Sequence, residues 1–177
     1  ILDVGGGLGF LGKRLDSSNE YVVIDGATVP FGKELCKGFW YKRDLDREEF
    51  GDRIYADSKQ PFDYAFCLET LEHLTNPYNC LAEIKKLVKE NGDIYISIPN
   101  VNVTHNYIYP GLMIDPKWFQ QFLDQMALPT IEYYLWDKGW NAHTWKLRNA
   151  PWTEAKMLFP KNEPKFYGKT PVEYVNL

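Results

Sequence analysis

The stretch Ile-Leu-Asp-Val-Gly-Gly-Gly-Leu-Gly, residues 1–9, decides the fold of this chain. A short apolar run leads into glycines at alternate positions, Gly5, Gly7 and Gly9, which is typical of a buried strand ending in a tight turn. Glycine suits such a turn because it tolerates positive φ and has no Cβ to hold a ligand away from the backbone. Residues 10–15 predict a helix start, whose free N–H groups favour an anionic or carboxylate-bearing ligand. The stretch therefore predicts a binding site for a nucleotide-type cofactor.

Two further helices follow from the sequence pattern. The clearer one begins at Asn76, which can cap its N-terminus, has Pro77 in the first helical position, and is expected to end at Gly92. The second is predicted from Asp115 onward. Its buried face would hold four apolar residues, Phe119, Phe122, Leu123 and Met126.

Strand and helix patterns alternate before a closing pair of strands. This order predicts an α/β fold with a doubly wound, mainly parallel seven-stranded sheet and a terminal antiparallel strand, a Rossmann-like arrangement that binds ligands at its carboxyl edge. The seven predicted strands are residues 1–4, 21–25, 39–42, 62–67, 94–98, 130–136 and 144–147, the last two joined around 139–141.

The domain organisation is simple, since no repeat or low-complexity linker interrupts the chain. We expect residues 1–150 to form one cofactor-binding domain and residues 151–177 to form a tail packed on it. The chain begins inside a strand without an initiator Met, so we also expect a segment before Ile1.

Composition indicates a globular enzyme of a reducing, cytoplasmic compartment. The 177 residues are 45% hydrophobic, and no apolar run approaches the roughly 20 residues of a membrane helix. Three cysteines are too few and too scattered for a disulfide framework. The net charge of −4 offers no field for long nucleic acid, so a small-molecule substrate is expected.

Two cofactors compete for the glycine turn. The spacing Gly7-x-Gly9-x-x-Gly12, with Asp25 closing the second strand, satisfies the dinucleotide fingerprint. Asp3 argues against a dinucleotide, because its carboxylate lies two residues before Gly5 and an anionic pyrophosphate would gain nothing from it. A ligand with a cationic group suits that position better.

This arrangement resembles the first motif of the class I S-adenosylmethionine-dependent methyltransferases of the small-molecule type. The segment 67–74, which contains Leu-Glu-His-Leu, is similar to that family's fourth-strand motif, and residues 87–92 with 98–100 look like its next block. The resemblance covers roughly residues 1–147 and implies S-adenosyl-L-methionine as the cofactor.

The resemblance also implies roles for single residues. Asp3 would lie near the ammonium group of the cofactor, and Asp25 would accept hydrogen bonds from both ribose hydroxyls. The other cofactor-binding residues implied around them are four glycines of the turn, Gly5, Gly6, Gly7 and Gly9, together with Gly26.

The adenine and sulfonium ends of the cofactor are assigned in the same way. Asp44 would accept from the adenine amino group, with Leu45 packed on the ring, although Asp46 is an equally placed acid and the choice stays open. Cys67 and Leu68 would supply backbone and apolar contacts near the sulfonium.

The candidate catalytic residues lie in the sequence Glu-x-x-Glu-His, formed by Glu69, Glu72 and His73. A similar segment holds a divalent metal in the ubiquinone-pathway O-methyltransferases and the small-RNA terminal 2′-O-methyltransferases, and one helical turn could bring the three side chains to one side. We expect instead no metal, with His73 and Glu69 as the catalytic residues and His73 as a base. His105 is a further ligand or base, or an exposed loop residue, and His143 is expected to be structural.

The predicted activity is methyl transfer to a small hydroxylated metabolite or glycan-type acceptor, with O-methylation preferred. A catalytically inactive binding module and an NAD-dependent oxidoreductase are the alternatives. Substrate identity is expected to reside in residues 101–116 and in the tail, which could also bind a partner chain, so a homodimer is open.

Overall fold

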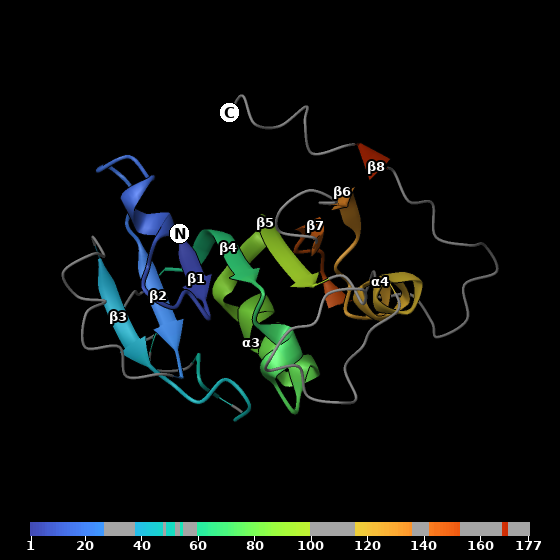
Figure 1. Ribbon diagram of the computed structural model, residues 1–177, viewed down its shortest axis with the longest axis horizontal. Helices are drawn as coiled ribbons and strands as arrows, with labels where there is room; N and C mark the ends of the chain where they lie inside the picture. The colour runs from blue at the N-terminus through green and yellow to red at the C-terminus, as the bar shows by residue number, and fades with distance from the viewer. Residues whose placement is uncertain are drawn as a thin grey trace.

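Eight strands are found in the part of the chain that the structure describes. The computed structural model describes residues 1–26, 38–47, 49–51, 54, 60–99, 116–135, 142–152 and 168–169. The strands are β1 (Leu2–Val4), β2 (Val22–Asp25), β3 (Phe39–Lys42), β4 (Phe62–Leu68), β5 (Val88–Pro99), β6 (Thr130–Leu135), β7 (Ala142–Arg148) and β8 (Gly168–Lys169). They form one sheet in the order β3-β2-β1-β4-β5-β7-β6-β8 (Figure 1).

The strand directions confirm the predicted sheet. Strand β1 pairs in parallel with β2 and β4, β2 with β3, and β4 with β5. Strand β7 runs antiparallel between β5 and β6, as expected for the closing strand. The two-residue β8, which belongs to the predicted tail, pairs in parallel with β6 and extends the seven strands by one. Parallel pairing brings the carboxyl ends of β1 to β4 to one edge.

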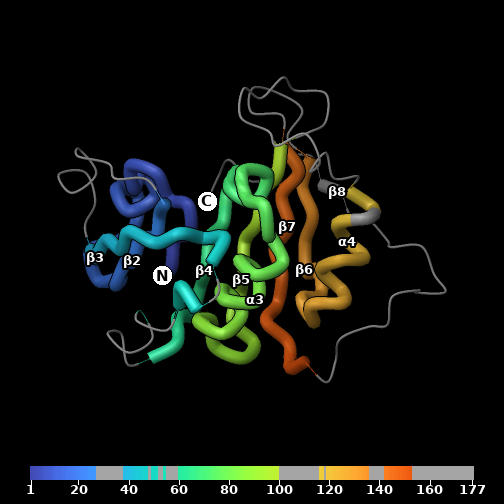
Figure 2. Tube along the Cα trace, turned by 90° about the horizontal axis from the view of Figure 1, so that it is seen from below, coloured from blue at the N-terminus to red at the C-terminus, as the bar shows by residue number. Residues whose placement is uncertain are grey.

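The hydrophobic core lies between the sheet and two α-helices, α3 (Pro77–Leu87) and α4 (Pro116–Gln125). Helix α3 packs against β5 and α4 against β6 (Figure 2). The predicted apolar face of α4 is confirmed, because Phe119, Leu123 and Met126 are fully buried. The ring of Phe119 packs edge-on against Trp145 of β7, with centroids 5.0 Å apart. Such ring pairs add to the stabilisation from burial alone.

Helix α3 begins where its sequence signals predict. Asn76 is the N-cap, and its Oδ1 accepts a hydrogen bond of 3.1 Å from the backbone N of Asn79. Pro77 occupies the first turn, where its missing N–H costs nothing. The apolar face buries Leu81 and Ile84.

The end of α3 differs from the prediction. The helix stops at Leu87 rather than at Gly92, because Val88 is already extended and pairs with Phe62 of β4. The side chain of Asn149 then holds this end, since its amide donates to the carbonyl oxygens of residues 85, 88 and 89 at 2.8 to 3.2 Å. Sequence alone did not reveal this cap, because Asn149 lies about 60 residues further along the chain.

No α-helix follows the glycine turn in the described residues, contrary to the prediction for residues 10–15. Only one 3₁₀ turn, η1 (Leu11–Lys13), is present. A Cβ on Gly12 would lie 2.5 Å from the ring of Tyr21, so the turn packs tightly on that ring. Asp16 then accepts from the backbone N of Ser18 at 2.8 Å, a local turn that competes with helix continuation.

The closing antiparallel pair, β6 and β7, is confirmed, whereas its connection at 139–141 lies outside the described residues. The same holds for most of the predicted substrate region at 101–116, including His105, and for most of the tail. Among the described helices, none combines the length and the apolar character needed to cross a bilayer.

Candidate functional site

The glycine turn has the backbone geometry that its sequence predicts. Gly5, Gly7 and Gly9 all have positive φ, at 72°, 52° and 69°, a conformation that other residues adopt only with strain. The backbone N of Gly5 donates to the carbonyl of Ile24 at 2.7 Å, which joins the turn to β2. A Cβ on Gly5 would lie 2.1 Å from Oγ1 of Thr70, so the turn also approaches the end of β4 closely.

The side chain of Asp3 packs against this turn. Its carboxylate is only 5% exposed and accepts a hydrogen bond from the hydroxyl of Tyr21. Burial raises the pKa of Asp3 to about 6, the Tyr21 hydrogen bond works in the opposite direction, and the nearby charge of Asp25 raises it further. A Cβ on Gly6 would lie 2.6 Å from the same carboxylate. Asp3 is thus packed between Tyr21 and the turn.

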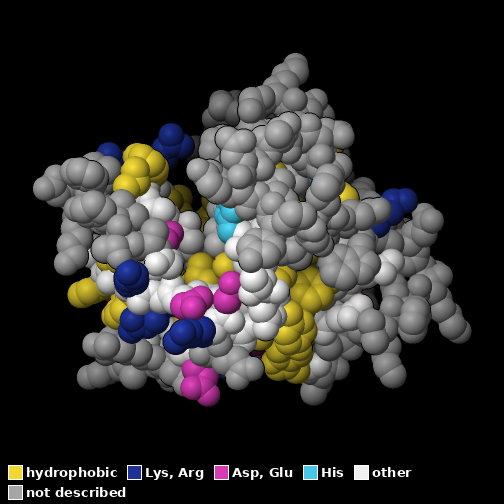
Figure 3. Space-filling view, turned by 60° about the horizontal axis from the view of Figure 1, so that its bottom comes forward, with side chains coloured by type: hydrophobic (Ala, Val, Ile, Leu, Met, Phe, Trp, Pro, Cys, Tyr) yellow, Lys and Arg dark blue, Asp and Glu magenta, His cyan; other side chains and the backbone are white. Residues whose placement is uncertain are grey.

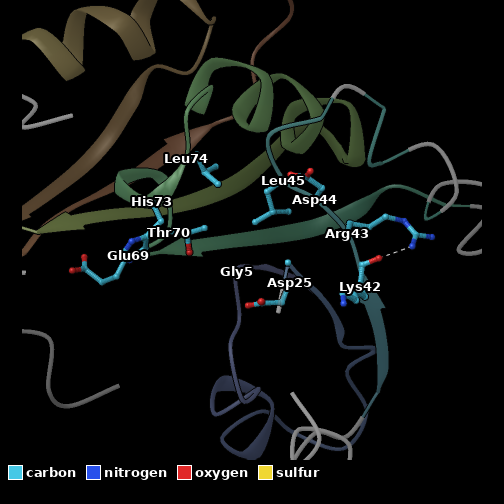
Figure 4. Close-up of a pocket in the computed structure, with 11 residues that line it drawn as sticks. Gly5, Asp25, Lys42, Arg43, Asp44, Leu45, Glu69, Thr70, His73 and Leu74 are labelled. Carbon is cyan, nitrogen blue, oxygen red and sulfur yellow. Dashed lines mark hydrogen bonds between the residues drawn. The ribbon is translucent and has the colours of Figure 1, made fainter. Parts of the chain in front are cut away.

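A cavity of about 590 Å³ opens at the carboxyl ends of the parallel strands. This volume lies within the range of small-molecule sites, about 300–1,000 Å³. Figure 4 shows Asp25 and Gly5 on one side of the space and Thr70 and His73 on the other, with the Glu69 side chain directed away from Asp25. The lining residues are Gly5, Asp25, Gly26, Lys42, Arg43, Asp44, Leu45, Glu69, Thr70, His73 and Leu74.

The structure brings seven of the thirteen predicted site residues into this lining. They are Gly5, Asp25, Gly26, Asp44, Leu45, Glu69 and His73. Sequence reasoning missed Lys42, Arg43, Thr70 and Leu74. Their position directly after β3 and β4 was the available signal, because residues that follow parallel strands form the binding edge of such sheets.

Six predicted cofactor contacts lie outside the lining: Asp3, Gly6, Gly7, Gly9, Cys67 and Leu68. Asp3 is directed to Tyr21 instead. Cys67 is fully buried beside Cys80 of α3, and Leu68 is 40% exposed, because successive strand residues point to opposite faces. Their expected backbone and apolar contacts with the sulfonium stay a prediction.

Asp25 is positioned by the turn that it faces. Its Oδ2 accepts a hydrogen bond of 2.9 Å from the backbone N of Gly7. Asp25 ends β2 and lines the cavity, so this contact holds its carboxylate at the edge of the ligand space. Gly7 therefore acts on the site through Asp25.

The structure separates Asp44 from Asp46, which the sequence left equivalent. Asp44 lines the cavity, whereas Oδ1 of Asp46 accepts a hydrogen bond of 2.8 Å from the backbone N of Asn76, the N-cap of α3. Asp46 thus anchors a helix start. The Asp44 carboxylate accepts from the backbone N of Asp46 at 3.1 Å and lies 3.2 Å from Arg47 Nε, so its own loop holds it at the cavity.

Glu69 has an unusual backbone conformation for its residue type, with φ at 51°. Ser97 of β5 holds it there. The backbone N of Glu69 donates to both the carbonyl and Oγ of Ser97 at 3.1 Å, and Ser97 Oγ donates to Glu69 Oε1 at 2.6 Å. Burial raises the pKa of Glu69, while the Ser97 hydrogen bond and the charge of His73 oppose this change. A strained residue at a pocket is a reason to look for function there.

Glu72 and His73 differ sharply in exposure although they are adjacent. They lie in the 3₁₀ turn η2 (Leu71–His73), where Glu72 is buried and His73 lines the cavity with its side chain 34% exposed. His73 Nε2 lies 3.7 Å from Glu72 Oε1. Burial raises the pKa of Glu72 to about 8, and the charge of Glu69 adds to this rise.

The side chains of Glu69, Glu72 and His73 are not arranged as a metal centre. In the described ranges, no group of three or more His, Cys, Asp or Glu side chains is placed to hold a metal ion. His143 lies apart from the cavity, with its Nδ1 2.6 Å from the Tyr133 hydroxyl in the buried part of the β6–β7 pair. His143 is thus structural, as predicted.

The rim of the cavity carries charges of both signs. Lys42 and Arg43 line it together with Asp25, Asp44 and Glu69. On the face shown in Figure 3, Lys and Arg side chains lie directly beside Asp and Glu side chains. A site of this kind can contact a zwitterionic ligand with both charges paired.

Comparison with known proteins gives a clear family match. A family model described as a methyltransferase domain matches residues 1–154. The chain is 32% identical over 106 residues to the ubiquinone biosynthesis O-methyltransferase of Saccharophagus degradans, covering 58% of this chain and 44% of that protein. With the enzyme of the same name from Aromatoleum aromaticum it shares 24% over 154 residues, covering 75% and 64%. The chain thus spans less than two thirds of these curated relatives.

Solved structures share the fold at low identity. A putative methyltransferase from Haloferax volcanii, solved with the Trm112 methyltransferase activator, matches with a TM-score of 0.66 and 14% identity, covering 85% of this chain and 81% of that one. The 1,6-didemethyltoxoflavin-N1-methyltransferase of Burkholderia thailandensis, solved with bound 1,6-didemethyltoxoflavin and S-adenosylhomocysteine, matches with a TM-score of 0.65 and 16% identity, covering 85% of this chain and 70% of that one. The family match over residues 1–154 favours the methyltransferase interpretation over the NAD-dependent oxidoreductase.

Proposed function

The chain belongs to the S-adenosylmethionine-dependent methyltransferases, and within that family we propose that it methylates a hydroxyl group of a small acceptor. The observation that carries this proposal is the pairing of an imidazole, His73, with a carboxylate, Glu69, on one side of the cavity. Such a pair suits a hydroxyl nucleophile, which must lose a proton when it attacks. The curated relatives are O-methyltransferases by name, which agrees with this choice.

The described residues fit the family's cofactor. Gly5 presents backbone without a Cβ to the cavity, which allows a ligand to approach closely. Asp25, at the end of β2, is placed to accept from the ribose hydroxyls, and its contact with Gly7 holds the carboxylate in position. Asp44 and Leu45 offer an acceptor and an apolar surface for the adenine ring. When bound, S-adenosylmethionine supplies an electrophilic methyl group.

The remaining work falls to the protein's own side chains. His73 accepts the proton of the acceptor hydroxyl as the oxygen becomes methylated. Glu69, held by Ser97, contributes negative charge beside the imidazolium that results. We propose that this transfer needs no divalent metal, because Glu69 is directed to Ser97 and Glu72 is buried.

A matched pair of acceptors tests the proposal. S-adenosylhomocysteine formation would be measured on a panel of small phenols and sugars, each compared with its analogue in which an amine replaces the hydroxyl. We expect turnover with at least one hydroxylated acceptor and little with its amine analogue. Preference for the amine would contradict O-methylation. Tight S-adenosylhomocysteine binding without turnover of any acceptor would favour an inactive binding module.

A further inference from the structure

Glu72 is buried without a hydrogen-bond partner. Its residue is 1% exposed, and neither carboxylate oxygen has a partner within the part of the chain that the structure describes. Leaving a buried carboxyl unpaired costs free energy, so such a group in a native structure needs an explanation. Packing alone does not supply one, because an apolar side chain of similar size would fill the same space at lower cost.

The surroundings of Glu72 direct attention to His73. The imidazole Nε2 lies 3.7 Å from Glu72 Oε1, just beyond a direct hydrogen bond. The other titratable groups that act on Glu72 or share its burial are Glu69 in the same loop, Cys67 in β4, and Cys80 in α3, whose thiol contacts that of Cys67. None of these three is a cation. The imidazole is therefore the group that a Glu72 oxygen can engage.

We propose that Glu72 is a positioning residue for His73: a Glu72 oxygen accepts the Nε2–H of the imidazole and so fixes the ring's tautomer and its place at the cavity. Since Nε2 then carries the hydrogen, Nδ1 is the nitrogen that takes a proton. This inference rests on the proposed function, in which His73 is the base. It assigns the buried carboxyl a task that neither a metal nor the cofactor requires.

The proton balance of the step is complete. As the acceptor oxygen forms its bond to the methyl carbon, the carbon–sulfur bond breaks and the hydroxyl proton moves to Nδ1 of His73. The ring becomes an imidazolium, with Nε2–H still directed to Glu72. The proton later leaves from Nδ1 to water, since the His73 side chain is one-third exposed. Long hydrogen bonds in a free enzyme commonly shorten when ligand binds.

The burial of Glu72 supports this role and predicts a second observable, a pH dependence of the His73 NMR signals. Burial raises the pKa of Glu72 to about 8, so the ionisation of this carboxyl falls in a pH range that can be followed on the folded protein. Above pH 8 the carboxylate forms and the hydrogen bond from Nε2–H becomes stronger. The chemical shifts of the His73 imidazole should therefore respond to the ionisation of Glu72.

Nitrogen-15 NMR of the imidazole tests the proposal on the full chain, with and without S-adenosylhomocysteine. The protein has three histidines, so His73→Gln assigns the signal. We expect the Nε2–H tautomer in the wild type and a second inflection near pH 8. Glu72→Gln keeps an acceptor and should keep the tautomer but lose the inflection. Glu72→Leu should lose both, and Glu69→Gln should keep both.

Each result decides the question. An Nδ1–H tautomer in the wild type, an unchanged tautomer in Glu72→Leu, or an inflection near pH 8 that persists in Glu72→Gln would overturn the proposal. If Glu72→Leu does not fold, the wild type and Glu72→Gln still decide it. Calorimetry with S-adenosylhomocysteine keeps the two proposals separate: we expect its affinity to change less than about threefold in Glu72→Gln, and absence of binding to the wild type would count against the proposed function alone.

Discussion

The hydroxyl of Tyr21 donates a hydrogen bond to the carboxylate of Asp3 beneath the glycine turn. Both side chains are almost completely buried, and their neighbours in the turn are glycines because a Cβ at Gly6 or Gly12 would overlap them. The packing of this pair therefore fixes how closely the turn lies against β1 and β2. It stands where the sequence predicted a direct contact between Asp3 and the cofactor.

Tyr21→Phe should destabilise the fold in a pH-dependent way. The change leaves the buried Asp3 carboxylate without this donor and costs about 1–3 kcal/mol at pH 7.5. In the wild type, the folded pKa of Asp3, about 6, lies above its unfolded value of 3.8, so the stability that Asp3 contributes is present below pH 4 and is lost as the pH rises to 6. The variant should raise the folded pKa further. Urea unfolding at pH 4.5 and 7.5 measures this.

The matched control for Tyr21→Phe is Tyr64→Phe, which removes a hydroxyl from an exposed tyrosine of β4. Its free energy of unfolding should change by less than about 0.5 kcal/mol at both pH values. An equal loss of stability at pH 4.5 and 7.5 in Tyr21→Phe would contradict the coupling to Asp3.

Asp25→Ala should weaken S-adenosylhomocysteine binding by about 30- to 100-fold, equivalent to about 2–3 kcal/mol, because a charged two-hydroxyl contact is lost. Isothermal titration calorimetry measures the affinity, and circular dichroism checks that the fold is kept. Asp63→Ala is the control, since Asp63 is an exposed acid at the opposite end of the strands, paired with Lys89. Equal effects of the two variants would rule out the ribose role of Asp25.

Asp44→Ala and Asp46→Ala should separate binding from stability. Asp44 faces the cavity, so its loss should weaken S-adenosylhomocysteine about 5- to 10-fold with little change in melting temperature. Asp46 accepts from the N-cap of α3, so its loss should cost about 1 kcal/mol of stability and leave affinity nearly unchanged. Thermal shift and calorimetry on both proteins test the pair. A reversed pattern would assign the adenine contact to Asp46.

Lys85→Met should destabilise the fold by about 2–4 kcal/mol. The Lys85 ammonium is buried and donates to Ala127 O at 3.2 Å, to Asn149 Oδ1 at 2.7 Å and to Ala150 O, so the change removes three buried hydrogen bonds at once. The control is Lys89→Met, whose ion pair with Asp63 is exposed and should contribute less than about 1 kcal/mol. Denaturant unfolding compares them. A similar loss in the free energy of unfolding for both variants would mean that the buried hydrogen bonds of Lys85 do not stabilise the fold.

Methyl transfer should persist in EDTA, whereas His73→Ala should reduce kcat about 100-fold or more because the base is lost. The acceptor found in the paired screen serves as substrate. Loss of activity on chelation, with recovery on adding magnesium, manganese or zinc, would instead assign the Glu69, Glu72 and His73 segment to a metal.

The sequence by itself determined the strand segments and their mainly parallel sheet, the glycine turn and the start of α3. These features depend on local rules: apolar runs of strand length, positive φ at alternate glycines, and an Asn-Pro helix start. Because parallel strands share one carboxyl edge, the rules also placed Asp25, Asp44 and His73 near one cavity. The first three signals depend on residues close together in the sequence, and the last depends only on the parallel direction of the strands.

Only the tertiary structure decided which of several similar side chains faces the ligand. Asp44 and Asp46 are two residues apart, yet Asn76 engages only Asp46. Glu69 and Glu72 looked alike, yet Ser97 of β5 holds the first while the core buries the second. The Asp3 carboxylate accepts a hydrogen bond from Tyr21. Each choice depends on a partner 18 to 30 residues away, and a side chain's direction and burial arise from packing that no local pattern contains.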